Sequence, residues 1–266
     1  MTGLRAAAAL AALALVAAAS AQTVEVGGWA LAEGAVVRSA SVTGLEAVVR
    51  GPGGEVAFGR RALEVATTTI DRVEAGRLMR AVQRLESASA KATVDGAPAP
   101  PGDPDPLLHR AVVIERTADG WRKRADGWQP TPDQLAALDE AISLDDAEYP
   151  TRMTVGETVV VPDSALRAVY LGAAPGPHRL TVRLDSVGTF EGGPAAFLTQ
   201  TVGVTVGDPG ETMRMDMTAR IVRRLDWRLD VRTEWEGPVR FEQGGLVIEG
   251  RMTQSATQTA TLPDDR

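Results

Sequence analysis

The feature that most restricts the fold is an alternation of apolar and polar side chains over residues 213–235. Apolar residues alternate at Met213, Met215, Met217, Ala219 and Ile221, and the pattern resumes at Leu225, Trp227, Leu229, Val231 and Trp235. Most residues between them are charged. A period of two with one apolar face is typical of antiparallel strands whose other face is in water. The interruption at Arg223-Arg224 predicts a turn or a β-bulge.

Shorter runs of the same kind extend this pattern along the chain. They predict strands at 23–31, 35–41, 55–59, 63–72, 77–87, 110–117, 179–187, 195–206, 239–242 and 246–260. The Asp-Gly pairs at 95–96, 119–120 and 126–127 are typical of hairpin turns. The segment 97–106 contains five prolines and is expected to be a stiff exposed loop that joins no strand ladder. We therefore predict a mainly β, α+β fold.

One helix is well marked, near residues 132–143. Thr131 is a good N-cap, Pro132 suits the first helical position, and Gln134 completes a capping box. One face of this helix is expected to carry Leu135, Leu138 and Ile142. A second, shorter helix is predicted from Asp163-Ser164 to Gly172. The related segment 43–50 could be helix or strand, because its two valines favour strand.

Four sequence blocks recur in the same order, which indicates an internal duplication. The blocks 33–37, 45–51, 70–73 and 114–122 match 155–159, 166–172, 184–187 and 221–228. The alternative is ordinary strand-and-turn composition. A duplication predicts two similar antiparallel lobes: an N-terminal β lobe at 22–130, a linker helix region at 131–150 and a C-terminal β lobe at 151–262. The tail 263–266 is expected to be disordered.

The first 21 residues have the pattern of a secretory signal peptide. One positive charge at Arg5 precedes an apolar run, and Ala19-Ser20-Ala21 fits the small-x-small cleavage rule. The alternative is an uncleaved anchor, but the apolar run is about 14 residues, whereas a spanning helix needs about 20. No later segment is apolar enough to span a bilayer. We expect the protein to be exported, to the periplasm or the extracellular space.

Composition excludes several classes of function. The formal net charge is −7, so the chain lacks the basic footprint of a nucleic-acid-binding protein. The sequence contains no cysteine, which excludes thiol nucleophiles, cysteine-ligated zinc and disulfides. The roughly 245 residues that would follow the signal peptide can bury a core without disulfides.

The sequence offers little catalytic chemistry. The two histidines, His109 and His178, are far apart and match no HExxH spacing, so we interpret them as surface residues. The nucleophile-elbow, Walker and dinucleotide-binding patterns are absent. We predict no catalytic, metal-binding or cofactor-binding residues, and no cofactor.

Carboxylates provide the remaining candidates for a metal or an acid–base pair. Two acidic clusters could offer oxygen ligands to calcium: Asp103 with Asp105, and Asp145, Asp146 and Glu148. Neither follows a known calcium-loop pattern, and solvated loops are the preferred interpretation. Asp71 and Asp185 recur at equivalent places in the repeat. We interpret them as turn residues that bind backbone amides, rather than as a catalytic pair.

Two groups of apolar side chains could contact a ligand. Met213, Met215 and Met217 form a flexible apolar stripe, and core packing is the preferred interpretation. The five tryptophans could line a sugar or lipid groove, but Trp121 and Trp227 are equivalent in the repeat, which favours a structural role. The charged face of 214–236 is expected to form a cross-strand ladder of opposite charges rather than a site for an acidic partner.

One phrase of the sequence suggests a family. Met153-Thr154-Val155-Gly156-Glu157-Thr158-Val159, after Tyr149-Pro150, resembles a motif of uncharacterised exported bacterial β-rich domains. That motif commonly has Trp where this chain has Val159. The family is one of unknown function, so the resemblance implies an exported β-rich domain but no activity and no site residues.

These observations favour a non-enzymatic, exported cell-envelope protein with a binding or scaffolding role. Its partner would be an unidentified envelope protein or an apolar ligand. The alternative is a periplasmic carrier of a lipid or acyl chain, which needs a large apolar cavity. A carboxylate-dependent glycan hydrolase is less favoured and needs two facing carboxylates about 5–9.5 Å apart. Unpaired strand edges would favour a protein that binds its partner by β-strand addition.

Overall fold

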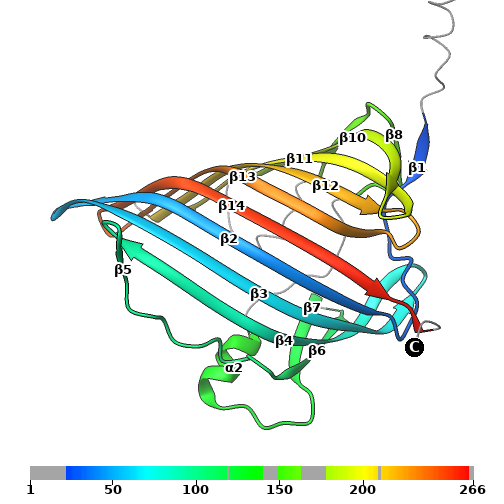
Figure 1. Cartoon of the computed structure of the whole chain (residues 1–266), viewed down its shortest axis with the longest axis horizontal. Coiled ribbons are helices and arrows are strands. Elements are labelled where there is room, and N and C mark those ends of the chain that lie inside the picture. Colours follow the sequence, from blue (N-terminus) through cyan, green and yellow to red (C-terminus); the bar gives the residue numbers. More distant parts are fainter. Residues whose placement is uncertain (1–21, 119, 140–148, 163–177, 209–210, 264–266) are drawn as a thin grey trace, which may run out of the picture.

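The chain forms one long, curved antiparallel sheet (Figure 1). The computed structural model describes residues 22–118, 120–139, 149–162, 178–208 and 211–263. Within these residues, twelve strands join in a single sheet, and a separate pair is formed by β1 (Thr23–Glu25) and β8 (Arg152–Thr154). The prediction of a mainly β fold is confirmed.

The sheet consists of two meanders joined along their first and last long strands. Its order is β7-β6-β4-β3-β2-β14-β13-β12-β11-β10-β9, and β5 is added to β4. The N-terminal half contains β2 (Val36–Gly51), β3 (Gly54–Glu74), β4 (Arg77–Val94), β5 (Ala97–Pro98), β6 (Ala111–Thr117) and β7 (Gly120–Ala125). The C-terminal half contains β9 (Thr158–Val161), β10 (His178–Phe190), β11 (Gly193–Asp208), β12 (Glu211–Arg224), β13 (Leu229–Gln243) and β14 (Leu246–Thr261). The halves meet where Val36–Arg50 of β2 pairs with Val247–Thr261 of β14.

Two of the repeated sequence blocks lie at matching places in the two halves. The register of β3 with β4 shifts between Ile70 and Arg72, and that of β10 with β11 shifts between Leu184 and Ser186. Asp71 and Asp185 are therefore the extra residues of two equivalent β-bulges. Each bulge leads to a hairpin whose two turn residues have positive φ, Ala75-Gly76 and Glu191-Gly192. The second copy of the 45–51 block, at 166–172, lies outside the described residues.

Several strands are longer than the sequence predicts. Strand β3 unites the two expected strands 55–59 and 63–72, and β2 resolves the choice at 43–50 in favour of strand. The sequence pattern did not predict one continuous strand because the residues between the two expected strands are small or charged, such as Gly59, Arg60 and Arg61. Their strand conformation is set by backbone pairing with strands on both sides, and not by their own propensity.

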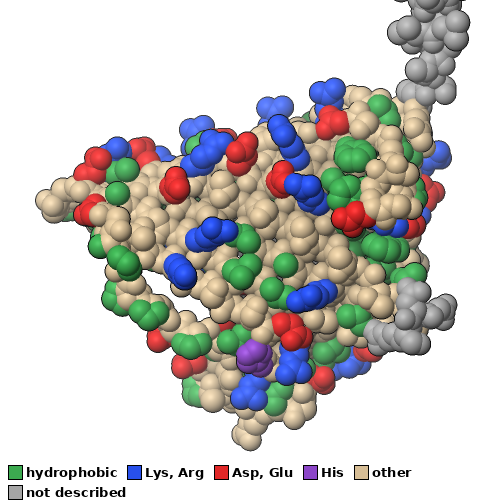
Figure 2. Space-filling view, viewed as in Figure 1, with side chains coloured by type: hydrophobic (Ala, Val, Ile, Leu, Met, Phe, Trp, Pro, Cys, Tyr) green, Lys and Arg blue, Asp and Glu red, His purple; other side chains and the backbone are tan. Residues whose placement is uncertain are grey.

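The alternation along each strand separates an apolar face from a polar face. The apolar face carries Leu180, Leu198, Ala219, Val239 and Met252, and the polar face carries Arg220, Glu236, Thr253, Arg61 and Lys91. Figure 2 views the charged, polar face.

The core lies on the apolar face. One buried cluster joins β10–β12 to the segment before β2 and to Tyr149 and Met153. A second cluster surrounds Ile70 and Leu78, where Leu31 and Ala35 cover the end of the sheet. The alternating residues of 213–235 thus pack as predicted, with Met217, Ala219 and Ile221 buried.

The interruption at Arg223-Arg224 holds two buried arginines. A bulge follows Val222, as predicted, and a turn follows Arg224. The Arg223 guanidinium donates to the backbone oxygen of Val26 (2.6 Å) and to Asp230 (2.8 Å), and it lies over the Tyr149 ring. Tyr149 also donates its hydroxyl to Asp230 at 2.8 Å. This network ties the segment before β2 to the C-terminal half of the sheet.

Helix α2 (Pro132–Asp139) begins as predicted. The Thr131 amide donates to the Gln134 side chain (2.9 Å), and the Gln134 amide donates to the Thr131 hydroxyl (3.4 Å), which forms the capping box. The helix packs on β6 and β7 through Leu138. The prediction that Leu135 shares this buried face is wrong, because its side chain is 49% exposed. Ala137 is buried in its place.

Some predictions lie outside the described residues. These are the signal peptide at 1–21, the helix residues 140–143, the second helix at 163–172 and the last tail residues 264–266. The proline-rich segment is described, and one part of its prediction is wrong. Ala97–Pro98 does join the sheet as β5, since the Asp95-Gly96 turn folds it back on β4, while residues 99–106 form an exposed connection.

The seam between the two halves depends on a glycine. A Cβ at Gly250 would lie 2.2 Å from the backbone oxygen of Glu46 and 2.6 Å from the Ala47 Cβ. We expect Gly250→Ala to lower the free energy of unfolding by about 1–3 kcal/mol, as overpacking does elsewhere. Gly53→Ala is the matched control, since no atom lies within 4 Å of its added Cβ. Equal stability of the two variants in urea unfolding would contradict this role of Gly250.

The Arg223 network gives a second stability prediction. Arg223→Ala leaves Asp230 and the Val26 carbonyl without their buried donor, and should cost about 3–5 kcal/mol. Arg232→Ala removes an exposed pair with Glu234 and should cost at most about 1 kcal/mol. Guanidinium unfolding of both variants measures the difference. A similar loss of unfolding free energy in both variants would contradict the prediction that the buried contacts of Arg223 contribute more than an exposed ion pair.

Candidate functional site

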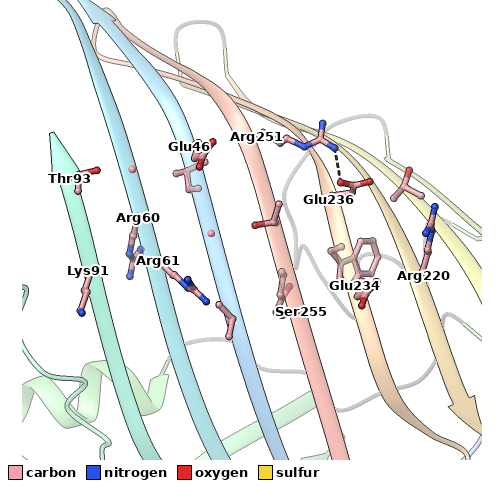
Figure 3. A pocket seen from close by; sticks show the side chains of 18 residues that line it. Glu46, Arg60, Arg61, Lys91, Thr93, Arg220, Glu234, Glu236, Arg251 and Ser255 are labelled. Carbon is pink, nitrogen blue, oxygen red and sulfur yellow. Dashed lines mark hydrogen bonds and ion pairs between the residues drawn. The ribbon is translucent and has the colours of Figure 1, made fainter. Parts of the chain in front are cut away.

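The polar face of the sheet contains a hollow with a volume of about 880 Å³. It crosses the seam between the two halves, with lining residues from β2, β3, β4, β12, β13 and β14 (Figure 3). Ligand sites commonly occupy about 300–1,000 Å³. The hollow is therefore large enough for a small molecule.

Two glycines leave the floor of the hollow bare. Gly44 pairs with both Arg61 and Thr253, and Gly59 pairs with both Glu46 and Thr93. A Cβ at Gly44 would lie 2.7 Å from the Thr253 hydroxyl, and one at Gly59 would lie 2.7 Å from the Thr93 hydroxyl. The hydroxyls of Thr253 and Thr93 thus lie above the two glycines, and they provide neutral hydrogen-bonding groups in the hollow.

One end of the hollow is basic. Arg61 on β3 lies directly opposite Lys91 on β4, on the same face of the sheet. Directly opposite side chains are about 4.5–5.5 Å apart at Cβ, and like charges so placed destabilise a sheet. Among the residues that the structure describes, neither side chain has a carboxylate within ion-pair distance. Both are exposed, and Lys and Arg side chains stand over the middle of this face in Figure 2.

The opposite end of the hollow is nearly neutral. Arg251 forms an ion pair with Glu236 at 2.7 Å, and Arg220 lies opposite Glu234 in the register of β12 and β13. Glu234 also forms an ion pair with Arg232. The hollow is therefore positively charged at the end that carries Arg61 and Lys91 and nearly neutral at the other end.

A second feature is the outer edge of β4. The Asp95 amide donates to the Ala57 oxygen, so these two residues form a hydrogen-bonded pair. Hydrogen-bonded pairs occur at every second position of an antiparallel ladder, so the backbone groups of Ser89 and Lys91 also bond to β3. Ala88 and Ala90 then point their N–H and C=O groups away from β3. The outward bonds end at Leu85, whose oxygen accepts from His109, and at Ala92, whose oxygen accepts from Ala99.

Between these two bonds, no described residue pairs with the outer edge of β4, the side that faces away from β3. The unpaired stretch 86–91 amounts to roughly 20 Å of strand edge at 3.3 Å per residue. The chain from β5 to β6 passes at a distance, and Figure 2 shows an opening between it and the sheet. Four prolines in this connection limit its own ability to pair with β4.

The apolar face also extends beyond the core clusters. Half-buried side chains continue along β12–β14 and β2 toward the far hairpins; they are Met213, Met215, Phe241, Ile248, Met252, Leu45 and Val49. The Gln200 side chain is 1% exposed on this face, and its amide nitrogen has no hydrogen-bond partner among the described residues. The methionine stripe thus belongs partly to the core, at Met217, and partly to this extension.

The structure does not bring the predicted histidines or acidic clusters into one site. His109 is exposed beside β4, while the backbone of His178 begins β10 in the other half of the sheet. Asp103 is exposed, and Asp105 accepts a hydrogen bond from the Leu107 amide at 2.7 Å. Residues 145–148 lie outside the described chain. No group of three metal-ligating side chains occurs among the described residues.

Asp71 and Asp185 have different partners from those predicted. Asp71 forms an ion pair with Arg80 at 2.8 Å, and Asp185 accepts from the Thr199 hydroxyl at 2.6 Å. Their interpretation as turn residues bound to backbone amides is wrong, because both are bulge residues within strands. They lie in different halves of the sheet, on β3 and β10.

The predictions for tryptophans and charges agree better with the structure. Trp29, Trp121 and Trp227 pack against the second core cluster, in structural positions. The charged face of β12–β14 forms cross-strand pairs such as Arg251–Glu236, together with pairs along single strands such as Arg214–Asp216.

Sequence reasoning missed both the basic end of the hollow and the unpaired edge. Arg61 and Lys91 are 30 positions apart, and only the register of β3 with β4 places them together. The sequence offers no local signal for this pair beyond the rarity of lysine, since Lys91 is one of only two lysines in the chain.

Comparisons with known proteins leave the family open. No family model matches the chain, and no curated protein matches it. A lipovitellin structure, described for its lipid–protein interactions, is similar at 11% identity with a TM-score of 0.47. The match covers 87% of this chain but only 26% of lipovitellin. DynF from the dynemicin biosynthesis pathway of Micromonospora chersina is similar at 9% identity with a TM-score of 0.25, over 93% of this chain and 90% of DynF. Likenesses of this size carry no inference about activity.

Among the described residues, no helix has the length and apolar character needed to cross a membrane.

The like-charged pair can be tested through stability. Lys91→Glu places a carboxylate opposite Arg61 and should stabilise the protein by roughly 0.2–1 kcal/mol at low salt. The gain should shrink at high salt, since exposed charges are screened. Lys91→Gln is the control and should give only part of the gain. Urea unfolding at two salt concentrations measures the effect, and a loss of stability in Lys91→Glu would contradict the repulsion.

Proposed function

We propose that this chain is an exported, non-enzymatic binding protein of the cell envelope that docks an extended segment of a partner protein. The single observation that supports this function is the unpaired edge of β4 at Ala88 and Ala90. Partner segments commonly bind such edges by adding one strand to the sheet.

The surroundings of this edge suit strand addition. An added strand would gain main-chain hydrogen bonds from Ala88 and Ala90, whose own side chains are small. The opening beside β4 gives it room, and the bonds at Leu85 and Ala92 mark its two ends. Natural proteins usually protect long free edges, because these invite pairing with other chains. Here the connection pairs with the edge only at Ala99, and residues 100–106 lie beside the edge without a backbone bond to it.

Proline provides a selective test of the edge. Ala90→Pro removes an N–H that points outward, so pairing with β3 should survive, as is usual for prolines on edge strands. A photo-crosslinking amino acid at position 90 first identifies the partner in the envelope of the producing cell. We expect Ala90→Pro to weaken binding of that partner's purified segment at least tenfold, whereas Ser89→Ala, a change on the polar face, should leave binding unchanged.

Amide hydrogen exchange supplies the second readout. Binding should slow exchange at Ala88 and Ala90 more than elsewhere in the sheet. Equal affinity of Ala90→Pro and the parent protein, or protection confined to another strand, would overturn the proposal. A circular dichroism spectrum of Ala90→Pro that matches the parent shows that the sheet is intact.

A second candidate function is carriage of an apolar ligand such as a lipid or acyl chain. It is favoured by the extension of the apolar face past the core clusters. Native mass spectrometry of protein purified without detergent tests it directly. A reproducible extra mass that organic solvent extracts supports the carrier, and a clean apo mass contradicts tight carriage.

A further inference from the structure

We propose that the basic end of the polar-face hollow binds a phosphate group, held by Arg61 and Lys91. This site is separate from the unpaired edge of β4, because it uses side chains of the polar face and not backbone groups of the edge. It assigns the hollow to a ligand class, namely an oxyanion on a small polar molecule or on a lipid headgroup.

The placement of charge favours an anion at this end of the hollow. Two cations that lie directly opposite each other repel in the free protein, and an anion between them would turn this repulsion into attraction. The chain as a whole is acidic, at −7, so two adjacent cations without a carboxylate partner stand out against its average charge. Three arginines elsewhere on the same face are paired with carboxylates, in Arg251–Glu236, Arg214–Asp216 and Arg232–Glu234, whereas Arg38 and Arg220 form no ion pair among the described residues.

Small residues and hydroxyls lie beside the pair. Gly44 is the neighbour of Arg61 on β2, and Gly59 precedes Arg61 by two residues on the same face. Neither glycine has a side chain that could shield the cations, and the position that its Cβ would take lies 2.7 Å from the hydroxyl of Thr253 at Gly44 and of Thr93 at Gly59. A phosphate held by Arg61 and Lys91 would therefore meet these two hydroxyls above the glycines.

The hydrogen-bond donors at this end of the hollow suit a phosphate. A guanidinium presents a planar fork of N–H groups that matches two oxygens of a phosphate, and a lysine ammonium adds a point charge. The hydroxyls of Thr93 and Thr253 line the same hollow and can donate to further oxygens or to hydroxyls of the attached molecule. The neutral end, at Arg220 and Glu234, can accommodate an uncharged polar portion.

Titration with two phosphate sources tests the site. Glycerol 3-phosphate serves as the soluble source, and vesicles containing phosphatidylglycerol, compared with pure phosphatidylcholine vesicles, serve as the lipid source. Both are measured at constant low ionic strength, by NMR shifts of the Gly44 and Gly59 amides and by vesicle co-sedimentation. The variant Arg61→Gln/Lys91→Gln should weaken binding at least tenfold. Arg38→Gln is the control, because Arg38 is exposed on the polar face of β2 outside the hollow.

Each outcome decides the proposal. Binding of glycerol 3-phosphate that depends on the pair supports the site with a soluble ligand. Pair-dependent binding of anionic vesicles alone supports it with a lipid headgroup. Binding that the double variant keeps, that Arg38→Gln reduces equally, or that is absent for both probes overturns it. Ala90→Pro should not change phosphate binding, so failure here is distinguishable from failure of strand addition at β4.

Discussion

The backbone ladder between β2 and β14 is the constraint on which the rest of the structure depends. It joins Val36–Arg50 to Val247–Thr261, so segments from the two ends of the described chain form the middle of the sheet. Without this ladder the two meanders would each end in a long unpaired strand, with the hazards of a free edge. Close approach at Gly250 and Ala47 makes the seam sensitive to a single methyl group.

The seam also creates the hollow and its polarity. Arg61 and Lys91 belong to the N-terminal half, while Glu234, Glu236 and Arg251 belong to the C-terminal half. Gly44 lies on β2 at the junction, and it has no side chain that would occupy the hollow. Joining a half with unpaired cations to a half with paired charges is what makes one end of the hollow basic.

The free edge of β4 has a different origin. Strand β6 covers only Arg80–Arg84 of β4, and β5 covers only Thr93–Val94. The intervening edge stays open because proline-rich chain connects the two covering strands, and proline lacks the N–H that a ladder requires. Edge and hollow adjoin on β4, yet one presents backbone groups and the other presents side chains.

The sequence by itself determined the elements whose signals are local. Alternation over 213–235, the Asp95-Gly96 turn and the Thr131 capping box each depend on neighbouring residues, and each was predictable. It did not determine which strands meet, because register is set by pairing between distant segments. Asp71 therefore proved to be a bulge residue. Leu135 is exposed because α2 packs on the sheet through Leu138, a contact between distant segments. Only the tertiary structure could place Lys91 opposite Arg61 or leave Ala88 and Ala90 unpaired, since both depend on how β3, β4 and β6 align.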